Sequence, residues 1–354
     1  MGWYKNRIST SKLNIYRVFP KVELHRHLEG SLRLSTLQDV AREHGITLPI
    51  SPTLRSLVQM QVDDPLSFNI FLSKFQTLRL FYRSPKVIQR ITREAIEDAA
   101  ADGIIYLELR FTPVALARLQ GFQLAEVMNW VCTAAEDASQ AAGITTRLIV
   151  SMNRHEDPAL GAQVVELAIA NRQRGILGVD LAGNEAEFSA DPFIPVLRRA
   201  REGGLKLTVH AGEWNGPANV RQAIETLGAD RIGHGVRVME DPAVVALAAE
   251  RGTPFEVCIT SNYQTGVIPA LGDHPVVRML NAGLNVTLGT DDPSISQIVL
   301  SDEYALAVEE LGLHPDTLVE RIYAAARASF LPEDDKTALL AVLKKRLSAL
   351  SPQA

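Results

Sequence analysis

Residues Lys21–His27, with the sequence KVELHRH, form a short and mostly apolar run that ends in two histidines two positions apart. Strands of a parallel sheet that is covered on both faces have this near-continuous apolar character. Seven similar runs follow along the chain, and with the first they make eight expected strands: Lys21–His27, Ile104–Arg110, Thr146–Met152, Leu177–Ala182, Leu205–His210, Arg231–Gly233, Phe255–Thr260 and Asn285–Thr290.

Segments with helical periodicity separate these runs. They lie at Leu34–His44, Val87–Asp102, Ala125–Ala142, Leu160–Arg174, Pro192–Glu202, Val220–Leu227, Pro242–Arg251 and Pro275–Ala282. Strands that alternate with helices predict an α/β fold with a parallel sheet. Because a doubly wound open sheet usually stops at five or six strands, eight strands favour a closed (β/α)8 TIM barrel.

The chain of 354 residues is longer than the roughly 250 residues of a simple barrel. The surplus falls in two places, a segment 45–85 rich in Phe and Leu after the first strand and a helical tail 303–354. We therefore expect one barrel domain over 1–354 rather than two domains. Insertions in this fold favour the face where the strands end, so we interpret 45–85 as a lid over the barrel mouth in preference to a helix pair packed on its side.

Composition restricts the class of partner. The 36 basic and 41 acidic residues give a net charge of −5, which provides no basic surface for nucleic acid or an anionic membrane. No stretch has the 18 apolar residues of a membrane span, and the amino-terminal segment lacks the apolar core of a secretory signal. Two cysteines, Cys132 and Cys258, form no disulfide framework. We expect a cytoplasmic protein that acts on a small molecule, in an oligomeric state that the sequence does not define.

Ionisable residues gather where the expected strands end. The first strand ends in His25 and His27, whose side chains point to the same side because they are two positions apart. The fifth ends in His210, the sixth is followed by His234, and the eighth ends before Asp291-Asp292. Each piece alone fits a turn or a helix cap. Their joint position at one end of the barrel favours a catalytic site, because active sites of this fold lie at that end.

Imidazoles combined with one carboxylate suit metal-assisted hydrolysis. The set that matches this donor pattern is His25, His27, His210 and Asp291. Zinc fits the nitrogen-rich set better than magnesium, which prefers oxygen ligands. Glu213, His234 and Asp292 then remain for proton transfer and orientation.

Four ordered motifs carry a resemblance to a known family. They are Pro20–Gly30 (PKVELHRHLEG), His210–Glu213 (HAGE), Arg231–Gly235 (RIGHG) and Thr290–Pro293 (TDDP). With them the chain, from about Pro20 to Tyr304, resembles the adenosine/adenine deaminase family of the amidohydrolase superfamily, and most closely its bacterial adenosine deaminases. The resemblance implies zinc-dependent hydrolysis of a 6-aminopurine nucleoside to its 6-oxo product and ammonia, as part of purine metabolism.

The resemblance also implies residue roles. His25, His27, His210 and Asp291 match the ligands of one zinc ion per subunit. Glu213 matches the acid that protonates purine N1, and His234 matches the histidine that orients and deprotonates the attacking water. Asp292 matches the carboxylate that engages N7, and Gly183 matches the glycine whose amide meets N3. The substrate-contacting positions are His27, Glu29, Gly183 and Asp292.

One position departs from the family pattern. Animal adenosine deaminases typically have Asp two positions after the second zinc histidine, where this chain has Glu29. That position faces the sugar hydroxyl, so the sugar contact is open. Adenosine or deoxyadenosine is the favoured substrate, because Ser261–Gly266 resembles the adenosine branch. Adenine, 6-aminodeoxyfutalosine and a nucleoside with a longer or phosphorylated sugar are the alternatives.

Two other classes of function are considered. A binuclear amidohydrolase typically needs a carboxylated Lys at the end of the fourth strand, and Val179–Glu185 contains none. A non-catalytic purine-binding protein on the same scaffold would have lost the acid or a ligand, yet all are present. Four histidines remain. His155 lies in an expected solvated loop, and His44, His274 and His314 lie beside Gly or Pro near expected helix ends, so we assign them no function.

Overall fold

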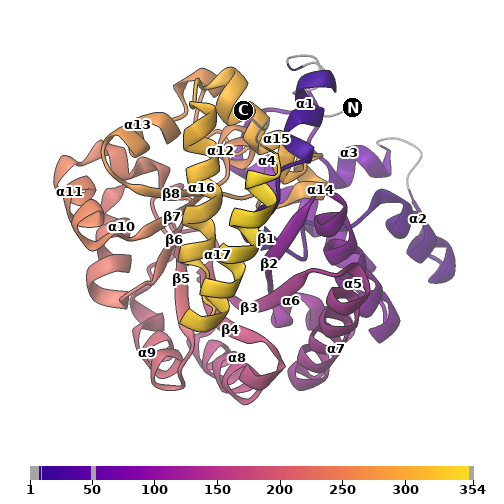
Figure 1. Cartoon of the computed structure of the whole chain (residues 1–354). Coiled ribbons are helices and arrows are strands. Elements are labelled where there is room, and N and C mark those ends of the chain that lie inside the picture. Colours follow the sequence, from indigo (N-terminus) through magenta and orange to yellow (C-terminus); the bar gives the residue numbers. More distant parts are fainter. Residues whose placement is uncertain (1–7, 9, 49–52, 351–354) are drawn as a thin grey trace.

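The structure is a computed structural model that describes residue 8 and residues 10–48 and 53–350. Its strands form one eight-stranded sheet with helices around it, as Figure 1 shows. The strands are β1 Lys21–His27, β2 Ile104–Phe111, β3 Thr145–Asn153, β4 Ile176–Ala182, β5 Lys206–His210, β6 Arg231–Gly233, β7 Pro254–Val257 and β8 Asn285–Leu288. All eight expected strands are present, and most begin or end within one residue of the predicted bounds.

The strands follow one another around the sheet in chain order, and every neighbouring pair is parallel. The residues just beyond β8 bring the two ends of the sheet together. The amide of His27 donates to the carbonyl of Asp291 at 2.8 Å, and the amide of Asp291 donates to the carbonyl of His25 at 2.9 Å. The predicted (β/α)8 TIM barrel is therefore confirmed, and three candidate ligands sit in the backbone that closes it.

The predicted end of the seventh strand is wrong by three residues. Instead of continuing to Thr260, β7 stops at Val257, and Ile259–Gln264 forms the short helix α12. The carboxylate of Glu303 accepts the amide hydrogens of Ile259 at 2.7 Å and Thr260 at 3.1 Å. This buried acid satisfies the first amides of the helix, which otherwise have no partner at a helix start. The end of β8, at Leu288 rather than Thr290, is likewise earlier than predicted.

Helices fill the connections. They are α1 Thr10–Arg17, α2 Leu34–Glu43, α3 Leu54–Val58, α4 Phe68–Leu78, α5 Pro85–Ala101, α6 Pro113–Arg118, α7 Leu124–Ala142, α8 Pro158–Ala170, α9 Ile194–Glu202, α10 Pro217–Gln222, α11 Pro242–Arg251, α12 Ile259–Gln264, α13 Val276–Asn281, α14 Pro293–Ser296, α15 Leu300–Ala305, α16 Pro315–Ala328 and α17 Glu333–Ser348. Several predicted helices end in shorter 3-10 or π turns, as at Ala223–Leu227 after α10. None of the helices in the described ranges has the length and apolar character of a membrane span.

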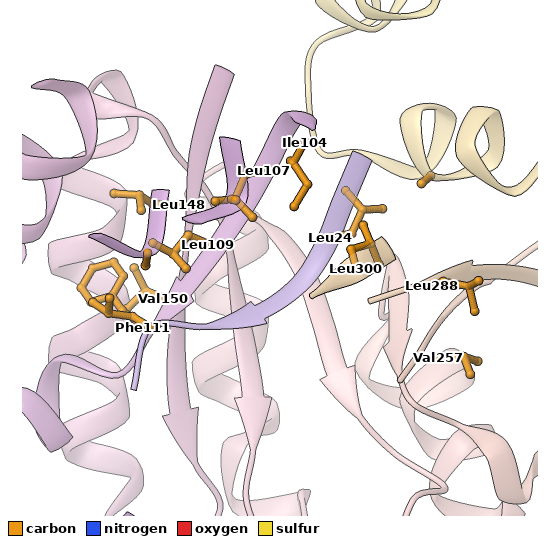
Figure 2. Packing of buried hydrophobic residues seen from close by; sticks show 14 of the residues in the cluster. Leu24, Ile104, Leu107, Leu109, Phe111, Leu148, Val150, Val257, Leu288 and Leu300 are labelled. Carbon is orange, nitrogen blue, oxygen red and sulfur yellow. The ribbon is translucent and has the colours of Figure 1, made fainter. Parts of the chain in front are cut away.

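Alternation along β2 shows how the barrel is built. Leu107, Leu109 and Phe111 are buried in the apolar core, and in register Leu109 lies beside Leu148 and Phe111 beside Val150 of β3 (Figure 2). The residues between them, Glu108 and Arg110, are fully buried and charged. Because successive strand residues point to opposite faces, the apolar set packs toward the helices and the charged set lies inside the barrel.

The tail covers the end of the barrel where the strands begin. Figure 1 shows α16 and α17, in yellow tones, lying across the barrel. Between them, the amide of Phe330 donates to Glu108 at 2.6 Å, and the ring of Phe330 lies 3.5 Å from the guanidinium carbon of Arg231. The tail thus seals one end, and the carboxyl ends of the strands remain for the site.

Helix α4 and the turn after it line the cavity at the carboxyl ends of the strands, through Phe71, Leu72, Phe75, Arg79 and Tyr82. Backbone hydrogen bonds fasten the insertion to the barrel loops, from Met60 to Ile295 and from Ser67 to Gln264. The part of the insertion from Phe71 to Tyr82 therefore borders this cavity.

Candidate active site

The structure brings the predicted residues together at the carboxyl ends of the strands. His25 and His27 end β1, His210 ends β5, and the others lie in the loops that follow β1, β4, β5, β6 and β8. One cavity is lined by eight of the nine: His27, Glu29, Gly183, His210, Glu213, His234, Asp291 and Asp292. His25 is fully buried beneath the cavity floor.

Four imidazoles surround the carboxylate of Asp291. Its Oδ1 lies 3.2 Å from Nε2 of His25 and 3.3 Å from Nε2 of His27. Its Oδ2 lies 3.9 Å from Nε2 of His234. The ring of His210 is 4.9 Å from that of His25, between centroids. Ligand atoms of His25, His210, His234 and Asp291 all lie within 4.8 Å of one another, which is the spacing of a metal site.

The neighbour of Nδ1 in each ring distinguishes His25 and His210 from His234. Nδ1 of His25 lies 2.9 Å from Glu256, and Nδ1 of His210 lies 2.9 Å from Asp180. A carboxylate there holds the hydrogen on Nδ1 and leaves the Nε2 lone pair for a metal. Nδ1 of His234 instead faces the amide nitrogen of Asn262 at 3.2 Å. The Nδ1 partners therefore suit His25 and His210 as metal ligands and set His234 apart from them.

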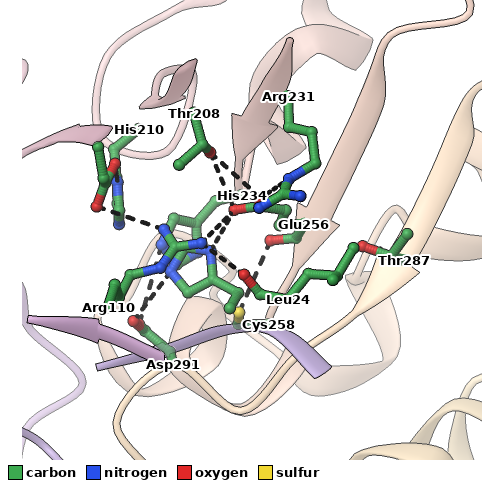
Figure 3. Close-up of polar contacts among 12 residues, drawn as sticks. Leu24, Arg110, Thr208, His210, Arg231, His234, Glu256, Cys258, Thr287 and Asp291 are labelled. Atoms are coloured by element: carbon green, nitrogen blue, oxygen red, sulfur yellow. Dashed lines mark hydrogen bonds and ion pairs between the residues drawn. The ribbon is translucent and has the colours of Figure 1, made fainter. Parts of the chain in front are cut away.

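A buried charge network holds the two carboxylates, as Figure 3 shows for Glu256. Arg110 lies 2.8 Å from Glu256 and 3.4 Å from Asp180, and Arg231 also binds Glu256. Burial alone would raise the pKa of Glu256, but the two guanidinium groups hold it well below its usual range. The acids thus stay ionised and accept the hydrogens of the imidazoles.

Sequence reasoning missed this network. Arg110, Asp180 and Glu256 lie inside strands that were identified by their apolar character. The available signal was a charged residue in the middle of an otherwise apolar run, because a buried charge requires a partner. In the fourth strand, which contains no lysine at its end, Asp180 orients His210.

Glu213 is a buried acid beside the cluster. Its Oε2 lies 3.7 Å from Nε2 of His234. Burial raises the pKa of Glu213 well above its usual range, and the nearby charges of Asp291 and Glu185 raise it further. Glu185 is itself occupied, because it accepts the amide hydrogens of Gly212 at 2.9 Å and Glu213 at 2.6 Å. Glu213 is therefore a buried acid at the cavity wall, in surroundings that favour its protonated form.

Unpartnered polar atoms mark where a ligand would bind. Within the described part of the chain, buried Oε2 of Glu29, the hydroxyl of Tyr82, Nε1 of Trp214 and Oδ1 of Asp292 have no hydrogen-bond partner. All four side chains line the cavity. Since buried polar groups are normally hydrogen-bonded, this concentration indicates a polar ligand.

The backbone is strained at two of the site residues. His234 has a φ of 58° and Asp291 a φ of 61°, in the left-handed region that L-residues with side chains rarely adopt. Such conformations cost on the order of 1–3 kcal/mol each and cluster at functional sites. Gly30 is needed for a different reason, since a Cβ there would lie 1.8 Å from Oδ1 of Asp292.

Comparisons with known proteins agree with this geometry. The family model described as Adenosine deaminase matches residues 20–346. The chain is 37% identical over 322 residues to an adenosine deaminase of Serratia proteamaculans, covering 90% of this chain and 96% of that protein.

Two solved structures are similar over almost their whole length. An amidohydrolase from Burkholderia ambifaria with bound Zn has a TM-score of 0.87 at 27% identity, covering 97% of this chain and 94% of that one. Arabidopsis ADAL complexed with IMP has a TM-score of 0.84 at 29% identity, covering 95% and 99%.

Proposed function

This chain belongs to the adenosine deaminase family, and we propose that it hydrolyses the 6-amino group of adenosine or deoxyadenosine, using one zinc ion. The products are inosine or deoxyinosine and ammonia. The observation that carries the proposal is the convergence of His25, His27 and Asp291 within 3.3 Å, beside the buried acid Glu213. A catalytic hydrolase is favoured over a purine-binding protein because the acid and every proposed ligand are present together.

The donor set fits zinc. Nε2 of His25 is buried 3.2 Å from Oδ1 of Asp291 without forming a hydrogen bond. Carboxylates hold the His25 and His210 rings at Nδ1. His25, His27, His210 and Asp291 would hold the ion. Zinc bound in such a site makes a water molecule acidic enough to attack at neutral pH.

We assign Glu213 as the proton donor to ring nitrogen N1. Its raised pKa favours the protonated carboxyl group, and its side chain lines the cavity in which the substrate would bind. Protonation of N1 withdraws electrons from C6, so water oxygen adds to C6 more easily. The C6–N bond then breaks, and the amino group leaves as ammonia after it gains a proton. The net reaction consumes one water and releases one ammonia.

Asp292 and Gly183 are proposed to bind the rest of the purine. Oδ1 of Asp292 is buried without a partner and can accept a hydrogen bond from the ligand. Gly183 lines the same cavity with a φ of 93°, and a residue with a side chain would be strained there. Asp292 would therefore bind the ring through its side chain, and Gly183 would bind it through its backbone amide.

Glu29 is proposed to contact the sugar. Its Oε1 accepts the amide hydrogen of Thr112 at 2.6 Å, which leaves Oε2 toward the cavity beside Tyr82. Burial raises the pKa of Glu29 to about 7, against the hydrogen bond from Thr112. A carboxyl group near its pKa can donate to or accept from a hydroxyl, so Glu29 remains compatible with a ribose or deoxyribose.

The fold and cysteines support the remaining assignments. We place the protein in the cytoplasm, where Cys132 and Cys258, both buried and free of a disulfide, would stay reduced. We also retain one barrel domain over 1–354, with 45–85 as its lid and 303–354 as its tail.

A substrate panel tests the proposal. Ammonia release and the ultraviolet change at C6 are measured for the zinc-loaded protein with adenosine, deoxyadenosine, adenine, adenosine monophosphate, N6-methyl analogues and 6-aminodeoxyfutalosine. We expect adenosine and deoxyadenosine to have the highest kcat/KM. Preference for adenine would overturn the sugar contact, and no amine release from any compound would overturn the function itself.

A further inference from the structure

A line of hydrogen bonds reaches His234 from behind the cavity. The backbone amide of Val276, the first residue of α13, donates to Nδ1 of His274 at 3.2 Å. Nε2 of His274 lies 3.3 Å from Oδ1 of Asn262, and Nδ2 of Asn262 lies 3.2 Å from Nδ1 of His234. All three side chains are at most 5% exposed. His274 and Asn262 do not line the cavity.

The backbone amide fixes the direction of the whole line. An N–H group can only donate, so Nδ1 of His274 must be the acceptor. Burial, together with the charge of Arg278, lowers the pKa of His274 to about 3, and the ring is therefore neutral. A neutral imidazole with Nδ1 as acceptor carries its hydrogen on Nε2. That hydrogen is donated to Oδ1 of Asn262.

The orientation of the Asn262 amide then determines which ring nitrogen of His234 carries the hydrogen. With Oδ1 toward His274, the NH2 group of Asn262 faces Nδ1 of His234. An amide nitrogen is a donor and not an acceptor, so Nδ1 of His234 accepts. The neutral His234 ring carries its hydrogen on Nε2, which points into the cavity.

The cavity side of His234 is consistent with this tautomer. Its Nε2 lies 3.7 Å from Oε2 of Glu213 and 3.9 Å from Oδ2 of Asp291, and both are carboxyl oxygens. His25 and His210 have the opposite tautomer, because carboxylates accept from their Nδ1 atoms. One site therefore contains two kinds of imidazole, distinguished by what lies behind each ring.

We propose that Asn262 and His274 are positioning residues that hold His234 with its hydrogen on Nε2, so that His234 donates into the cavity and cannot bind the metal there. This inference rests on the proposed function for its catalytic consequence. A hydrogen-bond donor at this position stabilises negative charge on the oxygen that adds to C6. Neutral His234 cannot take a proton at a nitrogen that already carries one.

The test compares Asn262→Asp with the matched exposed change Asn129→Asp. A carboxylate at 262 still accepts from His274, but it also accepts from His234 and moves the hydrogen of that ring to Nδ1. Proton-coupled nitrogen NMR of 15N-histidine-labelled protein reads the tautomer directly, with His234→Gln used to assign the signal. Zinc per chain, kcat and KM are measured on the same samples.

We expect Nε2–H for His234 in the wild type and Nδ1–H in Asn262→Asp. Loss of a partner of this kind typically costs 10–100-fold, so kcat should fall by about that factor while KM stays within about 3-fold. The Asn129→Asp variant should retain the wild-type values, and zinc content should be equal in all three proteins.

Two results overturn the inference. The first is an Nδ1–H signal for His234 in the wild type, a measurement that needs no variant to fold. The second is a folded Asn262→Asp protein with unchanged kcat. Lack of any deaminase activity in the wild type would instead count against the proposed function, because the tautomer is read independently of turnover.

Discussion

Nδ1 of His210 lies 2.9 Å from Oδ1 of Asp180, and Asp180 is completely buried inside the barrel. Asp180 also accepts from the hydroxyl of Ser151 at 3.0 Å. Burial would raise the pKa of Asp180, but the contact with His210, including its hydrogen bond, and the charge of Arg110 hold it below its usual range. A permanently ionised partner keeps the hydrogen of His210 on Nδ1 and turns Nε2 toward the metal site.

Asp180→Asn should therefore weaken zinc binding. The amide cannot hold the hydrogen of His210 as a carboxylate does, and losses of this kind cost 10–100-fold in metal affinity. Competition with a chelator measures the zinc Kd. Glu166→Gln, which alters an exposed pair with Arg199, is the control and should keep the wild-type Kd. Equal Kd values for Asp180→Asn and the control would show that the contact does not tune the ligand.

The ligand assignment predicts opposite results for two histidines of the same cavity. His27→Ala should lower zinc occupancy strongly, because it removes a ligand whose Nε2 lies 3.3 Å from Asp291. His234→Ala should retain zinc, because its Nε2 carries the hydrogen, but it should lose most turnover. Elemental analysis of dialysed protein gives the occupancy. Normal zinc occupancy in His27→Ala together with lost occupancy in His234→Ala would contradict the assignment and make His234 the ligand instead of His27.

Glu213→Gln should separate metal binding from catalysis. The amide keeps the size of the side chain but cannot deliver a proton to N1, and proton transfer of this type contributes about 10²–10⁴-fold to the rate. Zinc content and the melting temperature should remain close to wild type. Steady-state kinetics with adenosine measure the loss, and a kcat near the wild-type value would exclude Glu213 as the proton donor.

The eight strands were predictable because parallel strands covered on both faces are continuous apolar runs. The ends of the last two strands were not, since their bounds depend on tertiary contacts. Glu303, 43 residues further along the chain than Thr260, accepts the first amides of α12 and so ends the extended chain early. No local pattern around Phe255–Thr260 contains that information.

The residues at the cavity could be predicted from the sequence, but the residues that hold them in position could not. His25, His27 and His210 lie in recognisable motifs at strand ends, and the structure brings them together. From the sequence, His274 receives no function, because it lies beside Pro275 near an expected helix end. Its contact with Asn262 joins residues 12 positions apart. The direction of that hydrogen bond depends on the backbone amide of Val276. Because every residue except proline has such an amide, the sequence does not show which one takes part.

Buried His274 should make the protein less stable in acid. Its pKa is lowered from 6.5 to about 3 by burial and by Arg278. Below pH 6.5 the unfolded chain therefore binds a proton at His274 that the folded protein does not bind. Stability is therefore complete above pH 6.5 and falls as pH decreases toward 3, by about 2 kcal/mol at pH 5.

His274→Gln cannot titrate and keeps an amide donor toward Asn262. Urea unfolding at pH 7.5 and 5.0 measures the free energy of unfolding. Between these pH values the wild type should lose about 2 kcal/mol more than His274→Gln. The exposed change His44→Gln should lose as much as the wild type. An equal pH dependence in wild type and His274→Gln would show that the buried ring takes up a proton in the folded protein, and the line of hydrogen bonds to His234 would then have no fixed direction.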